Sequence, residues 1–254
     1  MKAVEISNLN FSYDDNVIFE NFSFNVEKGS FMTVLGRGGI GKSTLFKILK
    51  DEINYGGKVL FFNKSIKYSL EKGYVGYISL DCDYINGKVI DVLVDVLKLK
   101  GRTFDKIKVE LRRIVKKLEI EDLLYYDYSD LSISEKIVVM FAYQFLFKPR
   151  LLIIDNVIDY LDDEKDKTLR ELIRFNKRGT IINITNNTEE SLVGNHIFII
   201  GSGSYDVNSV DEDLFISNGL GVPFMISLCN KLKYYNLINT NYYNMEKLVD
   251  ALWE

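Results

Sequence analysis

Residues 36–44 read Gly36-Arg37-Gly38-Gly39-Ile40-Gly41-Lys42-Ser43-Thr44, and they fit the pattern G-x-x-x-x-G-K-[ST]. The glycines let successive backbone N–H groups curl around phosphate oxygens, because no Cβ blocks the close approach. A helix that begins at the end of such a loop directs its N-terminal amides at the same anion. We therefore predict that all nine residues form a phosphate-binding loop, in which the Lys42 amine bridges the outer phosphates and the Ser43 hydroxyl ligates Mg²⁺.

The residues on either side of this loop have the pattern that a strand, a loop and a helix require. Phe31-Met32-Thr33-Val34-Leu35 is a short apolar run, typical of a strand buried on both faces. After the loop, Leu45, Ile48 and Leu49 recur at helical spacing. A chance match to the motif arises in about 1% of chains of this length at average residue frequencies. The matching context on both sides makes chance a poor explanation.

Two further buried strands are predicted after the loop. Leu151 to Ile154 is an apolar run that ends at Asp155, whose carboxylate is suited to hold Mg²⁺ opposite the loop. Thr180 to Ile184 is another such run, and a helix is expected between the two, around Asp163 to Phe175. Strands that alternate with helices favour an α/β fold with a mostly parallel sheet.

Other segments fill in this α/β plan. Phe22, Phe24 and Val26 alternate with polar residues, as in a half-buried strand. The region from about 81 to 148 has helical patterning, including an apolar helix face from Ile107 to Leu118, and we interpret it as an inserted helical subdomain. The basic residues on the other side of that helix are interpreted as a solvated face.

Bulk composition narrows the classes of function. The 254 residues carry a net charge of −4, which gives no basic excess for a nucleic-acid surface. Two cysteines, Cys82 and Cys229, do not make a disulfide framework or a zinc site, so a reducing cytosolic setting is expected. No secretion signal is expected at the N-terminus. The longest nearly unbroken apolar stretch, Ile137 to Phe147, is too short to span a bilayer, so any membrane role is expected to come through a partner.

Three motifs around this framework resemble the ATPase subunits of ABC transporters. Tyr13, in Phe11-Ser12-Tyr13, stands where that family stacks an aromatic ring on adenine, although an ordinary strand aromatic is the alternative. Leu131-Ser132-Ile133-Ser134-Glu135 stands at the place of the family's L-S-G-G-Q signature. Asp159-Tyr160-Leu161-Asp162 resembles the family's D-loop. The resemblance implies ATP and Mg²⁺ as ligands, and a P-loop ABC-ATPase fold with an antiparallel N-terminal β subdomain.

The C-terminal stretch looks like the tail of energy-coupling-factor (ECF) ATPases, with a generic helical extension as the alternative. The stretches concerned are 218–224, 228–233 and 245–253. This resemblance implies an ATP-binding domain over 1–222 and a helical extension over 223–254. It also implies a second ABC ATPase, a transmembrane coupling subunit and a substrate-binding membrane protein as partners, at the cytoplasmic face of the membrane. Residues just after Leu80, through Asp91-Val92-Leu93, are then expected to form the docking surface.

Four positions depart from the family's pattern. Asn156 replaces the glutamate that activates the attacking water, and an amide cannot take up a proton. Asn186 replaces the switch histidine, and Leu80 stands at the glutamine that senses the γ-phosphate. The signature has Ile133 and Ser134 for its glycines and Glu135 for its glutamine, which predicts side chains and a charge where backbone faces the phosphate.

These departures lead to the hypothesis of a subunit that binds ATP but cleaves it poorly, and that pairs with an intact ATPase. In such a heterodimer Ser132 would complete the partner's site. Two alternatives stay open at this point. One is a self-sufficient ATPase in which another acid, such as Asp159, replaces the lost glutamate. The other is a non-transport ABC protein of DNA repair or the ribosome, which the acidic composition disfavours.

Overall fold

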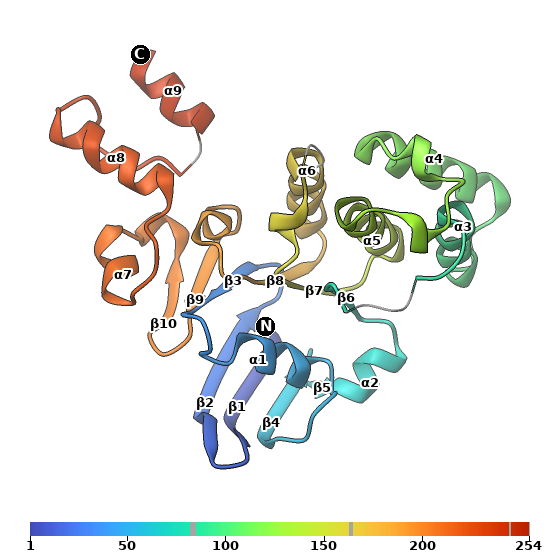
Figure 1. Cartoon of the computed structure of the whole chain (residues 1–254), viewed down its shortest axis with the longest axis horizontal. Coiled ribbons are helices and arrows are strands. Elements are labelled where there is room, and N and C mark those ends of the chain that lie inside the picture. The colour runs from blue at the N-terminus through green and yellow to red at the C-terminus, as the bar shows by residue number, and fades with distance from the viewer. Residues whose placement is uncertain (82–84, 163–164, 244, 254) are drawn as a thin grey trace.

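The computed structural model describes residues 1–81, 85–162, 165–243 and 245–253, and it contains two β-sheets (Figure 1). The smaller sheet is antiparallel, has the order β2-β1-β4-β5 and confirms the expected N-terminal β subdomain. Its strands are β1 (Lys2–Tyr13), β2 (Asn16–Glu27), β4 (Gly56–Phe61) and β5 (Lys64–Ser65).

The larger sheet has the order β10-β9-β3-β8-β7-β6. All its pairings are parallel except that of the edge strand β10 with β9, which confirms the mostly parallel α/β sheet. The predicted strands at 31–35, 151–154 and 180–184 are β3, β7 and β8. The six strands are β3 (Phe31–Leu35), β6 (Val75–Ile78), β7 (Leu151–Asp155), β8 (Thr180–Ile184), β9 (His196–Ile199) and β10 (Gly203–Asp206).

Nine α-helices are present in the described residues. The helix expected at 163–175 is α6, and its first two expected residues lie outside the described residues, as does Cys82. The helices are α1 (Lys42–Leu49), α2 (Ile66–Glu71), α3 (Val89–Leu99), α4 (Phe104–Leu118), α5 (Ile133–Phe147), α6 (Lys165–Asn176), α7 (Glu212–Ser217), α8 (Phe224–Tyr234) and α9 (Met245–Trp253).

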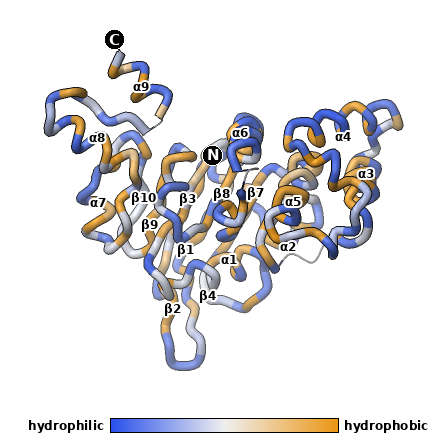
Figure 2. Tube along the Cα trace, turned by 45° about the horizontal axis from the view of Figure 1, so that its top comes forward, coloured by the Kyte–Doolittle hydropathy of each residue, from blue (hydrophilic) through white to orange (hydrophobic). Residues whose placement is uncertain are grey.

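Two hydrophobic cores lie on the two faces of the larger sheet. Leu151 and Ile153 of β7 face α1 and the smaller sheet, whereas Leu152 and Ile154 face α5 and α6. This alternation follows from the two-residue period of a strand, and a strand covered on both faces must be apolar throughout. Helix α1 is therefore held between the two sheets (Figure 1). Figure 2 shows the apolar colouring along the central strands and the mixed colouring of the outer helix α4.

The segment between β6 and β7 is helical, as expected, and carries α3, α4 and α5 (Figure 1). Its apolar side chains share one core with the sheet, because α5 packs on α3 and α4 and also above Leu152 and Ile154. At the other end, Ile226 of α8 packs with Ile197 of β9 and Phe215 of α7. Where one domain ends and the next begins, at 222, stays a prediction.

Two smaller observations complete the fold. Within the described residues, none of the helices has both the length and the apolar character needed to cross a membrane. The buried Cys229 has its thiol sulfur within hydrogen-bond distance of the backbone of Tyr242, which fastens α8 to the segment before α9.

Candidate nucleotide site

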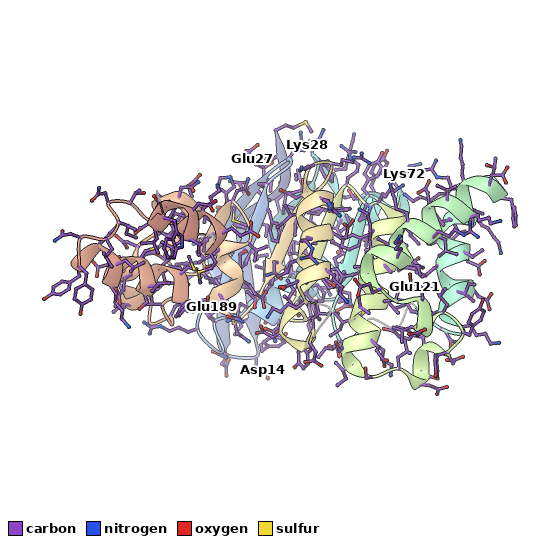
Figure 3. All side chains as sticks on the ribbon, turned by 90° about the horizontal axis from the view of Figure 1, so that it is seen from above. Asp14, Glu27, Lys28, Lys72, Glu121 and Glu189 are labelled. Carbon is purple, nitrogen blue, oxygen red and sulfur yellow. The ribbon has the colours of Figure 1, made fainter. Side chains whose placement is uncertain are left out.

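A pocket of about 510 Å³ lies where the parallel strands β6, β7 and β8 end and helix α1 begins. Ligands of open α/β sheets bind outside the carboxyl ends of the strands, and this is such a place. Asp14 and Glu189 mark this edge of the molecule, opposite Glu27 and Lys28 (Figure 3). The pocket is lined by Tyr13, Ile18, Gly38, Gly39, Gly41, Lys42, Ser43, Thr44, Ser79, Leu80, Asp81, Asp155, Asn156, Ile184, Thr185 and Asn186.

The loop that precedes α1 has the backbone conformation that the glycines permit. Gly41 has φ of 106°, and a Cβ there would lie 2.6 Å from Ile18 Cγ2 and 2.9 Å from the Phe19 ring. Both facts require glycine. The Lys42 ammonium donates to the carbonyls of Gly36 and Arg37, the second at 2.8 Å, so it lies within the loop rather than in solvent. Phosphate oxygens could replace these carbonyl acceptors.

Opposite charges face each other across the pocket. Lys42 is only 8% exposed, and this burial lowers the pKa of its ammonium group. The negative charge of Asp155 acts in the opposite direction and raises that pKa. The pKa of Asp155 is raised to about 6, first by burial and then by the nearby charge of Asp81, against the opposing effect of Lys42 and Lys50. The pocket thus holds a buried cation for phosphate and a carboxylate that a dication would stabilise in its ionised form.

The donors present fit Mg²⁺. Ser43 and Asp155 line the same pocket and offer a hydroxyl and a carboxylate oxygen. Mg²⁺ prefers oxygen ligands, and in phosphate sites it is held by one or two carboxylates together with substrate phosphates. Ligation by these two residues stays a prediction, as does phosphate binding by residues 36–44.

Tyr13 lies at the mouth of the pocket, at the end of β1. Its ring is edge-on to Phe11, with 4.7 Å between the ring centroids, and the residue is 44% exposed. A supported ring with a free face suits stacking on a planar base. Ile18 lines the pocket beside it.

The two asparagines at the substituted catalytic positions touch each other. Asn156 Oδ1 accepts a hydrogen bond from the Asn186 backbone N–H at 3.3 Å, and both residues line the pocket. Asn156 has φ of 49°, a left-handed conformation that asparagine tolerates better than most residues. The side chain of Asn156 therefore joins the strand ends of β7 and β8, and it has no group that could accept a proton from water.

Asp81 is an acid in the pocket that the sequence reasoning missed. It follows Leu80, which lines the pocket and is 48% exposed, and it is near enough to Asp155 to raise that residue's pKa. The signal was present in the sequence, since the carboxyl ends of neighbouring parallel strands meet at one edge and Asp81 follows β6 closely. Ser79, Ile184 and Thr185 were missed as well.

The signature residues 131–135 do not line this pocket. Ser132 is the N-cap of α5: its Oγ accepts from the Glu135 N–H at 3.3 Å, and the Glu135 carboxylate accepts from the Ser132 N–H at 2.8 Å. This reciprocal capping box follows the S-x-x-E pattern. The hydrogen bonds with Ser132 lower the pKa of Glu135, so the helix N-terminus carries its own carboxylate. The Ser134 hydroxyl accepts from the Asp162 N–H at 3.3 Å.

The C-terminal part of the chain contacts both loops of the site. The Arg37 side chain extends from the phosphate-binding loop and donates from Nε to the Asn218 carbonyl at 2.8 Å. Glu189, which follows the switch position, accepts from the Phe224 N–H at 2.7 Å, at the start of α8. These contacts were not foreseen, because the residues concerned lie far apart in the sequence.

Glu190 is a buried carboxyl beside the switch segment, 3% exposed. The pKa of this carboxyl is raised to about 7, mainly by burial and also by the charge of Asp159, although the 2.6 Å hydrogen bond from Asn183 Nδ2 lowers it. A raised folded-state pKa means that the folded protein holds the proton more tightly than the unfolded chain. Below about pH 4.5 this carboxyl therefore does not lower the free energy of unfolding. It lowers that free energy increasingly as the pH rises toward 7, and its destabilising effect is greatest above pH 7.

We expect Glu190→Gln to remove this cost at high pH. Relative to the native chain, the variant's free energy of unfolding should improve between pH 5 and pH 8 by at most about 3 kcal/mol, which corresponds to the pKa difference. Denaturant unfolding at both pH values measures it. The exposed Glu121→Gln is the control, and an equal pH response of the two variants would contradict the assignment.

Comparisons with known proteins agree with this geometry. Residues 19–159 match the family model described as ABC transporter. The ECF transporter ATP-binding protein EcfA1 of Fusobacterium nucleatum is 30% identical, over 99% of this chain and 98% of its own. The corresponding EcfA of Malacoplasma penetrans is 28% identical, over 99% and 93%.

A solved structure shows the same fold. CbiO1 of Clostridium perfringens, described as part of the ABC transporter complex CbiONQ, superposes with a TM-score of 0.68 at 23% identity, over 90% of this chain and 99% of its own. The family match covers more than half of the chain, and the similarity to EcfA1 extends over nearly all of it. The chain therefore belongs to the ATP-binding subunits of ABC transporters, in the energy-coupling-factor family.

Proposed function

We propose that this subunit holds Mg-ATP in the pocket of its own phosphate-binding loop and cleaves it poorly. The observation that carries the proposal is the pairing of Asn156 with Asn186 beside a complete loop. Lys42, Ser43 and Asp155 supply a cation, a hydroxyl and a carboxylate for the phosphates and the metal. Bound Mg²⁺ would neutralise phosphate charge. At the position of Asn156, where the family has a glutamate, the pocket has no group that could act as a general base.

The N-terminus of α5 supports a heterodimer. In the head-to-tail pairing of ABC ATPases, this helix end faces the nucleotide of the other subunit. Here the Glu135 carboxylate already occupies the helix N-terminus, and Ile133 is exposed beside it. A second anion is disfavoured at a helix end that already carries one. Two copies of this chain would therefore combine two weak signature ends with two pockets that lack the base. In a heterodimer with an intact ATPase, one pocket keeps the partner's general base and the other faces the partner's intact signature.

A self-sufficient ATPase is the second candidate, and Asp81 favours it more than Asp159 does. Asp81 lines the pocket, so its carboxylate could replace the missing glutamate. Asp159 does not line it: its carboxylate accepts from Asn187 Nδ2 at 2.6 Å and pairs with Lys165 at 3.3 Å. A carboxylate held in this way is poorly placed to reach a water in the pocket.

The proposed partners are a second, intact ABC ATPase, a transmembrane coupling subunit and a substrate-binding membrane protein, at the cytoplasmic face of the membrane. The support is the likeness to ECF ATP-binding proteins over the whole chain. Mild detergent extraction of cells that carry a tagged chain should recover a second ATPase and a multi-span membrane protein. Recovery of ribosomes or DNA instead, with no membrane protein, would refute the transport role.

A further inference from the structure

A second pocket, of about 390 Å³, lies at the opposite edge of the larger sheet, where β7 and β8 begin. Arg150 and Arg178, which line it, precede these two strands, and the Thr180 N–H donates to the Arg150 carbonyl. Glu27 and Lys28 mark this edge in Figure 3, and Gly29 is hydrogen-bonded to Thr180. The volume is in the range of small-molecule sites. The pocket is therefore separate from the nucleotide site, which lies at the other ends of the same strands.

The floor of this pocket is apolar. Ile114 of α4, Phe145 and Leu146 of α5, and Phe175 of α6 contribute to it. The rings of Phe145 and Phe175 lie together, with 6.1 Å between their centroids. Such a floor suits a flat or aliphatic group of a ligand.

The wall of the pocket is basic. The last turns of α4 contribute Arg113 and Lys117, and the link from α5 to β7 contributes Lys148 and Arg150. Two of these cations already have partners: Lys148 pairs with Glu110, which is not in the lining, and Arg150 lies 4.2 Å above the ring of Phe62.

The last turn of α6 adds Arg174, and the residues just after it add Lys177 and Arg178. Glu171 is the one acid of the lining. Lys117 and Arg174 both pair with Glu171. Within the described residues, Arg113, Lys177 and Arg178 make no ion pair shorter than 4.0 Å. The pocket therefore combines an apolar floor with three cations that make no such ion pair, although Arg113 is near enough to Glu110 to help lower its pKa.

The concentration of charge is unusual for this acidic chain. Seven cations and one anion give the lining +6, and because the whole chain carries −4, the remainder carries −10. Cations at the ends of α4, α5 and α6 offset the helix dipoles, but each helix end carries only about half a negative charge. The dipoles of three helix ends thus offset only a minor part of the +6 charge of the lining. The rest gives a strong positive potential over a concave apolar surface, which attracts anions.

We propose that this pocket binds a small organic anion, a phosphate ester with an aromatic or aliphatic group. The phosphate would contact Arg178, Arg113 and Lys177. A guanidinium group can donate two parallel N–H bonds to two phosphate oxygens, and the lysine ammonium adds a positive charge. The apolar group would lie on Phe175 and Phe145. A ligand here would link α4, α5 and α6, and so would connect the helical segment to β7 and β8, the strands that lead to Asp155 and Asn186.

Titration with 1-naphthyl phosphate tests the proposal, using full-length chain that carries Lys42→Ala so that the first pocket does not compete. We expect saturable binding by calorimetry, and binding at least tenfold weaker for the double variant Lys177→Gln/Arg178→Gln. The matched control is Lys106→Gln/Lys108→Gln, which removes two exposed cations of α4 outside the pocket and should change the affinity less than twofold. Thermal melts check that both double variants fold.

The apolar floor is tested separately with Phe175→Leu. This variant should weaken the binding of 1-naphthyl phosphate and leave that of inorganic phosphate unchanged, since only the naphthyl group contacts the ring. Absence of saturable binding to the parent chain would overturn the proposal. Equal affinities of the Lys177→Gln/Arg178→Gln variant and its control would also overturn it, because the anion would then lie elsewhere.

Discussion

Replacement of Lys42 by alanine is expected to weaken ATP binding by about 100-fold or more. The Lys42 ammonium lies in the loop on the carbonyls of Gly36 and Arg37, where it can exchange these acceptors for phosphate oxygens without moving into solvent. Charge-assisted hydrogen bonds contribute about 1.5–3 kcal/mol each, and two of them correspond to two or more orders of magnitude in affinity. A fluorescent ATP analogue titrated in the presence of Mg²⁺ measures the loss.

Lys47→Ala is the matched control for this experiment. Lys47 lies on the exposed face of the same helix α1, so its removal changes the charge equally but takes nothing from the pocket. It should bind the analogue within about twofold of the native chain, because a surface charge at this distance is screened. Equal binding by Lys42→Ala and the native chain, or no binding by the native chain, would contradict the assignment of the nucleotide pocket.

The purified chain alone is expected to hydrolyse ATP at least about 100-fold more slowly than an intact ECF ATPase measured beside it. Loss of a positioned general base costs about 10²–10⁴ in rate, and the Asn156 side chain instead accepts the Asn186 N–H. Steady-state phosphate release at saturating ATP measures the turnover. Because Lys42→Ala is expected to weaken ATP binding about 100-fold, its phosphate release in parallel assays defines the background.

Restoring the two side chains together should raise the turnover. We expect Asn156→Glu with Asn186→His to exceed the native rate by at least about tenfold, and each single change to achieve less, because the two positions are in contact and act as a unit. Glutamate at a φ of 49° costs about 1–2 kcal/mol of stability, so the melting temperature should fall with it.

The competing assignment makes the opposite prediction. If the native chain hydrolyses ATP at the rate of intact relatives, and Asp81→Asn abolishes this whereas Asp159→Asn does not, the pocket has its own substitute acid. Asp81 lines the pocket and Asp159 does not, so the pair of variants separates a residue in the site from one beside it.

The parts of the fold that follow from sequence are those whose pattern is local. Phe31 to Leu35 is apolar except for the buried Thr33, because β3 is covered on both faces, and this pattern is visible in the sequence. The α/β order and the helical segment after β6 follow in the same way, whereas the antiparallel N-terminal strands were implied by the family resemblance. The S-x-x-E pattern of the capping box is also present in the sequence, at Ser132 and Glu135, and the structure shows the carboxylate bonded to the Ser132 N–H.

The sequence alone was enough to predict the phosphate-binding loop, because its backbone amides, its glycines and Lys42 lie within nine consecutive residues and need no distant neighbour to be recognised. Only the tertiary structure decided that Asn156 bonds to Asn186, that Asp81 enters the nucleotide pocket, and that the ends of α4, α5 and α6 form a basic pocket. These arrangements depend on parallel strands and their crossover helices, which bring together residues far apart in the chain. The spacing of such residues along the sequence does not indicate that they lie close together in the fold.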